Sequence, residues 1–302
     1  MSSVKVIRRR IRSSKNIAQI TKAMEMVSAS KMRRAQEAAL SSRPYAEKMM
    51  AVITALSSRA KNQIEHFLLT DPRLNWDSDK PFNILIVLIS TDKSLCGGLN
   101  TNLFRGLEAW LKDLKTSYQL PPQIKLNFIT VGKKAKEHIL KSGRMLLAEF
   151  SRLSDRPKFT DITPISRLVI EGFKKGEFQM AFLVFMKFIS TISQKISSQQ
   201  LLPIQAQEIS GAVIKPKTYY LFEPSPADIF KVLLPQYIEL RLYHTLIESI
   251  ASEHSARMVA MKNANENALE IVSDLTLEYN QARQTKITNE LLDVTGARMA
   301  LE

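Results

Sequence analysis

The stretch Ala251–Ala282, ASEHSARMVAMKNANENALEIVSDLTLEYNQA, decides the fold of this chain. Ten of its positions follow one another in alternating steps of three and four: Ala251, His254, Met258, Met261, Asn265, Ala268, Val272, Leu275, Tyr279 and Ala282. Such a heptad pattern predicts a helix that packs along a second helix. The residues of this seam are mostly small or flexible, and two are polar, so we expect a slim helix pair that is less stable than a leucine zipper.

The helix around this seam should be long, from about Pro226 to the C-terminus, with an early kink at Pro235. About 70 residues at 1.5 Å each span on the order of 100 Å, which is too long to be buried in a compact domain. A second helix is expected over residues 2–60, where Pro44 predicts a kink or break. Its apolar residues recur mostly every three or four positions, at Ile7, Ile11, Ile17, Ile20, Met24 and Val27.

Charge differs between the two ends of the chain, whose formal net charge is +14. Between Lys5 and Arg43 there are eleven Lys or Arg and two acids, whereas from Ser252 onward there are five Lys or Arg and eight acids. Two such helices attract each other when they pair, and the remaining positive charge favours an acidic partner. Nucleic acid, an anionic membrane surface and an acidic protein all remain candidates.

The middle of the chain alternates strand and helix patterns, which predicts a mainly parallel sheet. Strands are expected at Phe82–Ser90, Lys125–Val131 and Gln179–Ile189, helices at Leu99–Lys115, Lys133–Lys141 and Ile162–Lys175, and edge strands at Gln194–Ile204 and Thr218–Phe222. The predicted fold is therefore a Rossmann-like α/β domain (residues 80–205) inserted between two terminal segments. Those segments, 1–60 and 212–302, are expected to pair as an antiparallel coiled coil.

Few residues suggest catalysis. Ser94–Asn100, SLCGGLN, lies between a strand and a helix but matches neither GxGxxG nor GxxxxGK[ST], so a tight turn is the simpler interpretation. Cys96 is the one cysteine, which excludes an internal disulfide, and the four histidines, His66, His138, His244 and His254, lack metal-site spacing. We expect no catalytic, cofactor-binding or metal-binding residues, no transmembrane helix and no signal peptide.

Three stretches resemble the γ subunit of F-type ATP synthases. Ile17–Gln36, IAQITKAMEMVSASKMRRAQ, resembles its N-terminal signature, and Leu95–Asn100, LCGGLN, resembles a central landmark. The C-terminal signature is matched by ASEHSARMVAMKN (Ala251–Asn263), Asn267-Ala268, YNQARQ (Tyr279–Gln284) and ITNEL (Ile287–Leu291). The resemblance implies a non-catalytic rotor shaft, one copy per complex, that couples ion flow through a membrane c-ring to ATP synthesis or hydrolysis on the β subunits.

By the same resemblance, the partners are the α3β3 hexamer, the ε subunit and the c-ring, with no nucleic acid and no cofactor. The implied α3β3 contacts are Lys22, Met24, Arg257, Arg283, Gln284, Thr288 and Glu290. The implied contacts of the foot with the c-ring and ε are Tyr237, Glu239, Arg241 and Tyr243. Because the family motif begins close to the N-terminus, the resemblance leads us to expect no transit peptide. The expected location is therefore peripheral, on the cytoplasmic face of a bacterial inner membrane.

Two alternatives stay open from the residues alone. One is a basic coiled-coil arm that binds RNA or DNA, although only Tyr45 interrupts the basic residues with an aromatic ring before Phe67. The other is a nucleotide-binding enzyme that uses the Gly97-Gly98 turn.

Overall fold

The chain forms two compact units in a computed structural model, which describes residues 4–60, 66–70, 81–204, 223 and 225–299. One unit contains residues 1–29 and 257–302, and the other contains residues 30–256. The helices are α1 (Val4–Ala60), α2 (Leu99–Ser117), α3 (Lys133–Lys141), α4 (Thr163–Lys174) and α6 (Pro226–Met299), with a 3-10 turn η2 (Phe159–Asp161). The strands are β1 (Phe82–Ile89), β2 (Ile124–Val131), β3 (Met145–Phe150), β4 (Met180–Phe188) and β5 (Gln194–Leu202).

The five strands form one sheet in the order β3-β2-β1-β4-β5, in which β5 alone is antiparallel to its neighbour. This confirms the mainly parallel sheet. Strand β3 was not expected, because Met145–Phe150 is short and half exposed and lacks the long apolar run that marks β1 and β4. The strand expected at residues 218–222 lies outside the described residues.

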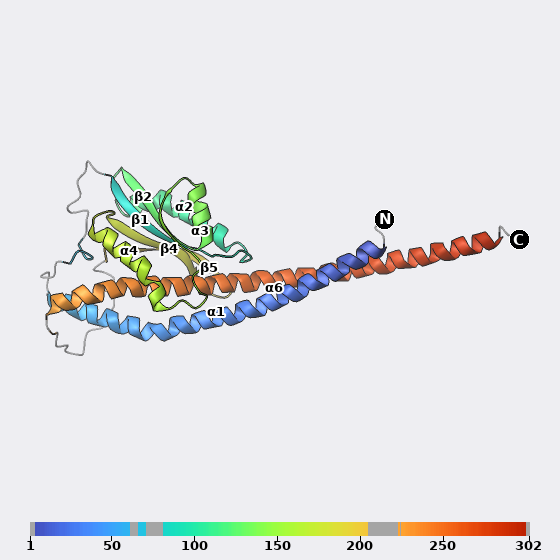
Figure 1. Cartoon of the computed structure of the whole chain (residues 1–302), viewed down its shortest axis with the longest axis horizontal. Helices are drawn as coiled ribbons and strands as arrows, with labels where there is room; N and C mark the ends of the chain where they lie inside the picture. The colour runs from blue at the N-terminus through green and yellow to red at the C-terminus, as the bar shows by residue number, and fades with distance from the viewer. Residues whose placement is uncertain (1–3, 61–65, 71–80, 205–222, 224, 300–302) are drawn as a thin grey trace. The chain divides into compact units, whose positions relative to one another are not determined.

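Alternate residues of β1 face two different cores, as the pleat of a strand requires. Ile84, Ile86 and Leu88 pack with the buried leucines of α2 and with α3. Leu85, Val87 and Ile89 pack with α4 and with the parts of α1 and α6 that belong to the same unit. The sheet is thus covered on one face by α2 and α3 and on the other by α4, α6 and α1 (Figure 1).

In the helical unit, residues 4–29 of α1 and 257–299 of α6 run antiparallel (Figure 1). Asn265 of α6 donates its side-chain amide to the carbonyl oxygen of Ala18 at 2.6 Å. The expected seam on α6 is confirmed in this unit. Its members are buried or half-buried, whereas most residues between them are exposed.

The face that α1 presents to α6 differs from the expected one. Ile17, Ile20 and Val27 are 49%, 59% and 54% exposed, while the smaller Ala18 and Thr21 are buried. Small residues let the two backbones approach closely, and branched side chains in their place would separate the helices. The Thr21 hydroxyl donates to the carbonyl of Ile17 at 2.9 Å, so this polar group is satisfied inside the contact.

Neither proline ends its helix. Helix α1 continues through Pro44 and α6 through Pro235, so the expectation of a break at Pro44 is wrong. A proline inside a helix costs about 3 kcal/mol. Burial of Met49 and Ile53 after Pro44 and of Leu234 before Pro235 offsets that cost through packing against the core. Within the described residues, no helix has a stretch apolar and long enough to cross a membrane.

Candidate functional site: the surfaces of the two long helices

The last four turns of α6 carry the most exposed surface of the helical unit. Every residue from Arg283 to Ala297 is exposed, and the buried seam ends at Ala282. Local bonds support the helix here, including a Lys286–Glu290 ion pair at 3.4 Å and a bond from the Thr288 hydroxyl to a backbone carbonyl. A segment of this length is only marginally helical alone in water. A surrounding partner would therefore stabilise it.

An apolar stripe runs along this exposed end. Ile287, Leu291 and Val294 are 43%, 62% and 68% exposed and are spaced by four and three residues, which places them on one face of the helix. Exposed apolar side chains aligned on one face make this stripe a candidate interaction surface. Arg283 and Gln284 are exposed one turn before the stripe, where they can bond to polar groups of a partner.

The other residues with an implied hexamer contact differ in exposure. Lys22 is exposed and pairs with Glu25 at 3.0 Å, and Met24 is half-buried. Arg257 is 8% exposed, so its side chain is mostly enclosed by the chain itself. Thr288 and Glu290 are exposed. The structure therefore places Lys22 and the four α6 residues on the surface, and their contacts with a partner stay predictions.

The basic residues expected to face an acidic partner also lie on the surface. Within the helical unit, six cationic side chains are exposed near the start of α1: Lys5, Arg8, Arg9, Arg10, Arg12 and Lys15. Together with Lys22 they give this helix a cationic surface. A groove beside it is lined by Ala18, Met26, Leu269 and Val272. The helical unit thus offers apolar and cationic surface together.

The four residues implied for the foot have partners within their own unit. Tyr237 is 4% exposed, and its hydroxyl accepts a bond from Arg241 at 2.8 Å. Arg241 also donates to the side-chain carbonyl of Gln199 on β5 at 3.1 Å. These bonds hold α6 against the sheet.

The remaining two foot residues, Glu239 and Tyr243, connect α6 to α4 and to the segment just before it. The Glu239 carboxylate accepts a bond from the buried hydroxyl of Ser166 at 3.0 Å. The ring of Tyr243 packs edge-on against Phe159, and its hydroxyl lies 3.4 Å from the carbonyl of Pro157. Their contact with a partner is untested and stays a prediction.

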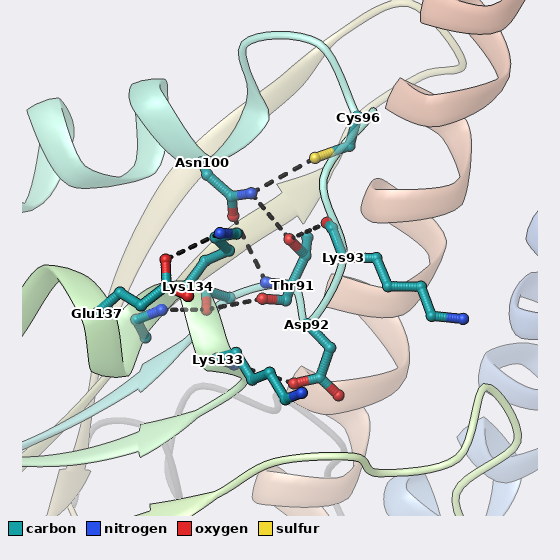
Figure 2. A network of polar contacts seen from close by, with 10 residues as sticks. Thr91, Asp92, Lys93, Cys96, Asn100, Lys133, Lys134 and Glu137 are labelled. Atoms are coloured by element: carbon teal, nitrogen blue, oxygen red, sulfur yellow. Dashed lines mark hydrogen bonds and ion pairs between the residues drawn. The ribbon is translucent and has the colours of Figure 1, made fainter.

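The SLCGGLN turn is held by hydrogen bonds of the chain itself (Figure 2). Asn100 donates its amide to the Thr91 hydroxyl at 2.8 Å and lies 3.5 Å from the sulfur of Cys96, which is buried. The Thr91 hydroxyl in turn donates to the carbonyl of Lys93 at 2.8 Å. The strand-to-helix turn is therefore a folded, internally bonded loop.

Asp92 was not singled out from the sequence, yet it occupies the position where such folds often bind phosphate. Its carboxylate accepts the backbone N–H of Lys133, at the first turn of α3, at 2.9 Å (Figure 2). It also accepts the backbone N–H of Arg152 at 2.8 Å. A carboxylate at the start of α3 occupies the place where an anion would bind. Its negative charge also repels other anions. The signal available in the sequence was an acid three residues after the end of a buried strand.

Comparisons with known proteins agree with one another. A family model described as ATP synthase matches residues 3–301. An ATP synthase gamma chain from Dehalococcoides mccartyi is 42% identical over 304 residues, which cover all of both chains. One from Herpetosiphon aurantiacus is 40% identical over 306 residues, which cover 100% of this chain and 99% of the relative.

Solved structures share the fold. A chain of the Euglena gracilis mitochondrial ATP synthase, from a structure of its OSCP, F1 and c-ring, superposes with a TM-score of 0.64 at 20% identity. That match covers 99% of this chain and 94% of the other. A central-stalk and c-ring structure from Tetrahymena thermophila gives a TM-score of 0.55 at 23% identity, covering 81% and 99% of the two chains.

Proposed function

The chain belongs to the ATP synthase gamma-chain family, and we propose that its helical unit is the part of the central stalk that turns inside the catalytic α3β3 hexamer. It is a non-catalytic rotor subunit, and the chemistry takes place on the β subunits. Ion flow through the membrane c-ring turns it during ATP synthesis, and hydrolysis turns it the other way. The nucleic-acid alternative finds no support among the relatives.

One observation carries the proposal: the end of α6 is exposed on all sides and has an apolar stripe. A marginally stable helix end with exposed Ile287, Leu291 and Val294 gains stability when a sleeve encloses it. The exposed polar residues Arg283 and Gln284 can bond to polar groups of that sleeve in some orientations of the rotor. We expect Thr288, Glu290, Lys22, Met24 and Arg257 to line the same contact, the last two with their less exposed side chains.

Cationic side chains of α1 would meet acidic groups of the hexamer. Exposed ion pairs contribute only about 0–1 kcal/mol each, so many weak contacts guide the helix without trapping it at one angle. The small residues of the seam keep the pair slim, because they allow close approach of the backbones. Both features suit a shaft that must turn.

The α/β unit would rest on the ε subunit and the c-ring. We expect Tyr237, Glu239, Arg241 and Tyr243 to act there by fixing the start of α6 against the sheet and α4, since each has a partner within the unit. Neighbouring exposed residues of α6, such as Val232 at 59%, would then present the contact surface. The bacterial relatives favour a peripheral position on the cytoplasmic face of the plasma membrane.

The test is assembly and rotation of the full chain with α and β subunits of the same source. We expect co-purification of all three, ATPase activity only in the assembly, and stepwise rotation of a bead attached to this chain. Removing residues 283–302 should weaken assembly and slow rotation several-fold. The truncated chain should stay folded, with the helical circular dichroism signal per residue of the full chain. An isolated chain that hydrolyses a nucleotide, or an assembly in which the bead stays still, would overturn the proposal.

A further inference from the structure

Two loops of the α/β unit contact α6 at two consecutive residues, His254 and Ser255. Asp155, between β3 and η2, places a carboxylate oxygen 3.5 Å from the Nε2 atom of His254. Thr191, in the turn between β4 and β5, accepts a hydrogen bond from the Ser255 hydroxyl at 2.6 Å. The amide of Gln194, at the start of β5, lies 3.5 Å from the same hydroxyl. His254 and Ser255 are 2% and 0% exposed, so both contacts are made inside the unit.

The same carboxylate also reaches α1. The other oxygen of Asp155 accepts a hydrogen bond from the ammonium group of Lys31 at 2.5 Å. Partial burial alone would raise the pKa of Asp155. The bond and charge of Lys31, with smaller contributions from His254 and Lys93, outweigh burial and hold that pKa below its ordinary value. One ionised side chain thus ties both long helices to the α/β unit.

The position of these contacts along the helices is significant. The α/β unit comprises residues 30–256, so Lys31 and Ser255 both lie within two residues of its limits. Beyond those limits α1 and α6 belong to the helical unit, whose seam is mostly small and apolar and contains the hydrogen bond from Asn265 to the Ala18 carbonyl. An apolar seam is non-directional and resists sliding weakly. Hydrogen bonds to charged or fully buried groups have fixed geometry and resist both sliding and rotation.

We propose that Asp155 and Thr191, with Lys31, His254 and Ser255, form a collar that fixes the two helices against rotation relative to the α/β unit. The collar rests on the proposed rotor function, in which torque must pass between the helices and the α/β unit. Without it, twist applied at one unit would be absorbed by slippage of the helices instead of reaching the other. These five residues are positioning residues for torque transfer.

The test uses the complete enzyme in sealed inverted vesicles. Its variant combines Asp155→Asn with Ser255→Ala, which removes the charge and the hydroxyl while keeping the side chains nearly the same size. Loss of the charge-assisted bond of Asp155, or of the buried hydroxyl bond of Ser255, raises the population of an open collar by roughly tenfold. ATP hydrolysis and ATP-driven ion pumping, the latter followed with a potential-sensitive dye, are measured together. We expect hydrolysis to be retained and the ratio of pumping to hydrolysis to fall several-fold.

A second readout is the angular fluctuation of a bead fixed to the α/β unit while the hexamer is attached to glass. We expect a wider distribution for the double variant. The matched control is Glu137→Gln, which removes only an exposed ion pair with Lys134 on α3 and should leave both readouts as in the wild type.

The outcomes separate the two proposals. Wild-type chain that neither assembles nor rotates would overturn the rotor function itself. A wild type that rotates and a double variant with an unchanged pumping ratio and unchanged fluctuation would overturn the collar alone. Should the double variant fail to assemble, the single variants Ser255→Ala and Lys31→Met are compared in its place, and the same unchanged readouts in both would overturn the collar.

Discussion

The two ends of α6 have opposite surroundings, although they belong to one continuous helix of 74 residues. Near its start, Tyr237 is 4% exposed, and Glu239 and Arg241 bond to side chains of other elements. Near its end, every residue from Arg283 to Ala297 is exposed. Both stretches resemble contact motifs of the same family, but the residues named in the first are buried or half-buried, whereas those named in the second are exposed.

This difference separates two meanings of a family motif. A residue can match the family motif because it stabilises the fold or because it binds a partner. A sequence pattern does not distinguish these two causes. The structure does, through burial and internal bonds. Substitutions near the start of α6 should therefore change the free energy of unfolding. Substitutions near its end should leave that energy unchanged and change assembly or coupling.

The largest effect is expected for Tyr237→Ala. It removes a buried aromatic ring and leaves the Arg241 guanidinium without the phenol oxygen 2.8 Å away. Emptying such a site costs about 3–5 kcal/mol. Urea unfolding of the full chain, followed by circular dichroism, measures the loss. Tyr237→Phe is the control, since it keeps the ring and should cost only about 1 kcal/mol. Equal midpoints for wild type and Tyr237→Ala would contradict the placement of this ring in the core.

Arg241→Met should have the next largest effect. Methionine retains the apolar stem of the side chain, but it loses the bonds to Tyr237 and to Gln199 on β5. Loss of these two hydrogen bonds costs about 1–3 kcal/mol. The same urea titration applies, with Arg167→Met as control, because Arg167 on α4 is 75% exposed and makes only a local pair with Glu171. If both variants unfold at the same urea concentration, Arg241 does not hold α6 to the sheet.

The parts of the fold that sequence predicted well are those with strong periodicity. The alternating steps of the α6 seam identified the residues that the helical unit buries, and the apolar run of β1 identified the central strand. The inner face of α1 was predicted only in part: Ile7 is buried as expected, whereas Ile17 and Ile20 are exposed and the smaller Ala18 and Thr21 make the contact. Close helix packing selects small residues, and hydrophobicity alone does not reveal them.

The candidate site was predictable only in part. The resemblance named Arg283 and Gln284, and the structure places both on the surface. It also named Tyr237 and Arg241, whose bonds to each other and to β5 depend on distant elements that no local pattern reports. Asp92 was missed for the same reason, since its two backbone partners lie 41 and 60 residues away along the chain.

Arg283→Ala combined with Gln284→Ala tests the exposed end of α6. Both residues are exposed, so the free energy of unfolding should stay within about 0.5 kcal/mol of the wild type. In the assembled enzyme, the same change should lower the ratio of ion pumping to hydrolysis or weaken assembly. Arg167→Ala on α4 is the matched control for loss of an exposed arginine. A stable double variant with wild-type assembly and pumping would remove these two residues from the contact.

The smallest effect is expected at Glu248, on the part of α6 that belongs to the α/β unit. Burial raises the pKa of its carboxyl group, and the charge of Lys187 offsets only part of that rise. A raised pKa means that the folded chain binds this proton more tightly than the unfolded chain, so stability is lost as pH increases through the raised value. Glu248→Gln removes the ionisation and should raise the unfolding midpoint at pH 7. Below about pH 4, where the wild-type group is protonated in both states, the two proteins should unfold alike. An equal gain at both pH values would instead assign the effect to packing of the amide, and a loss at pH 7 would show that the ionised carboxylate stabilises this stretch of α6.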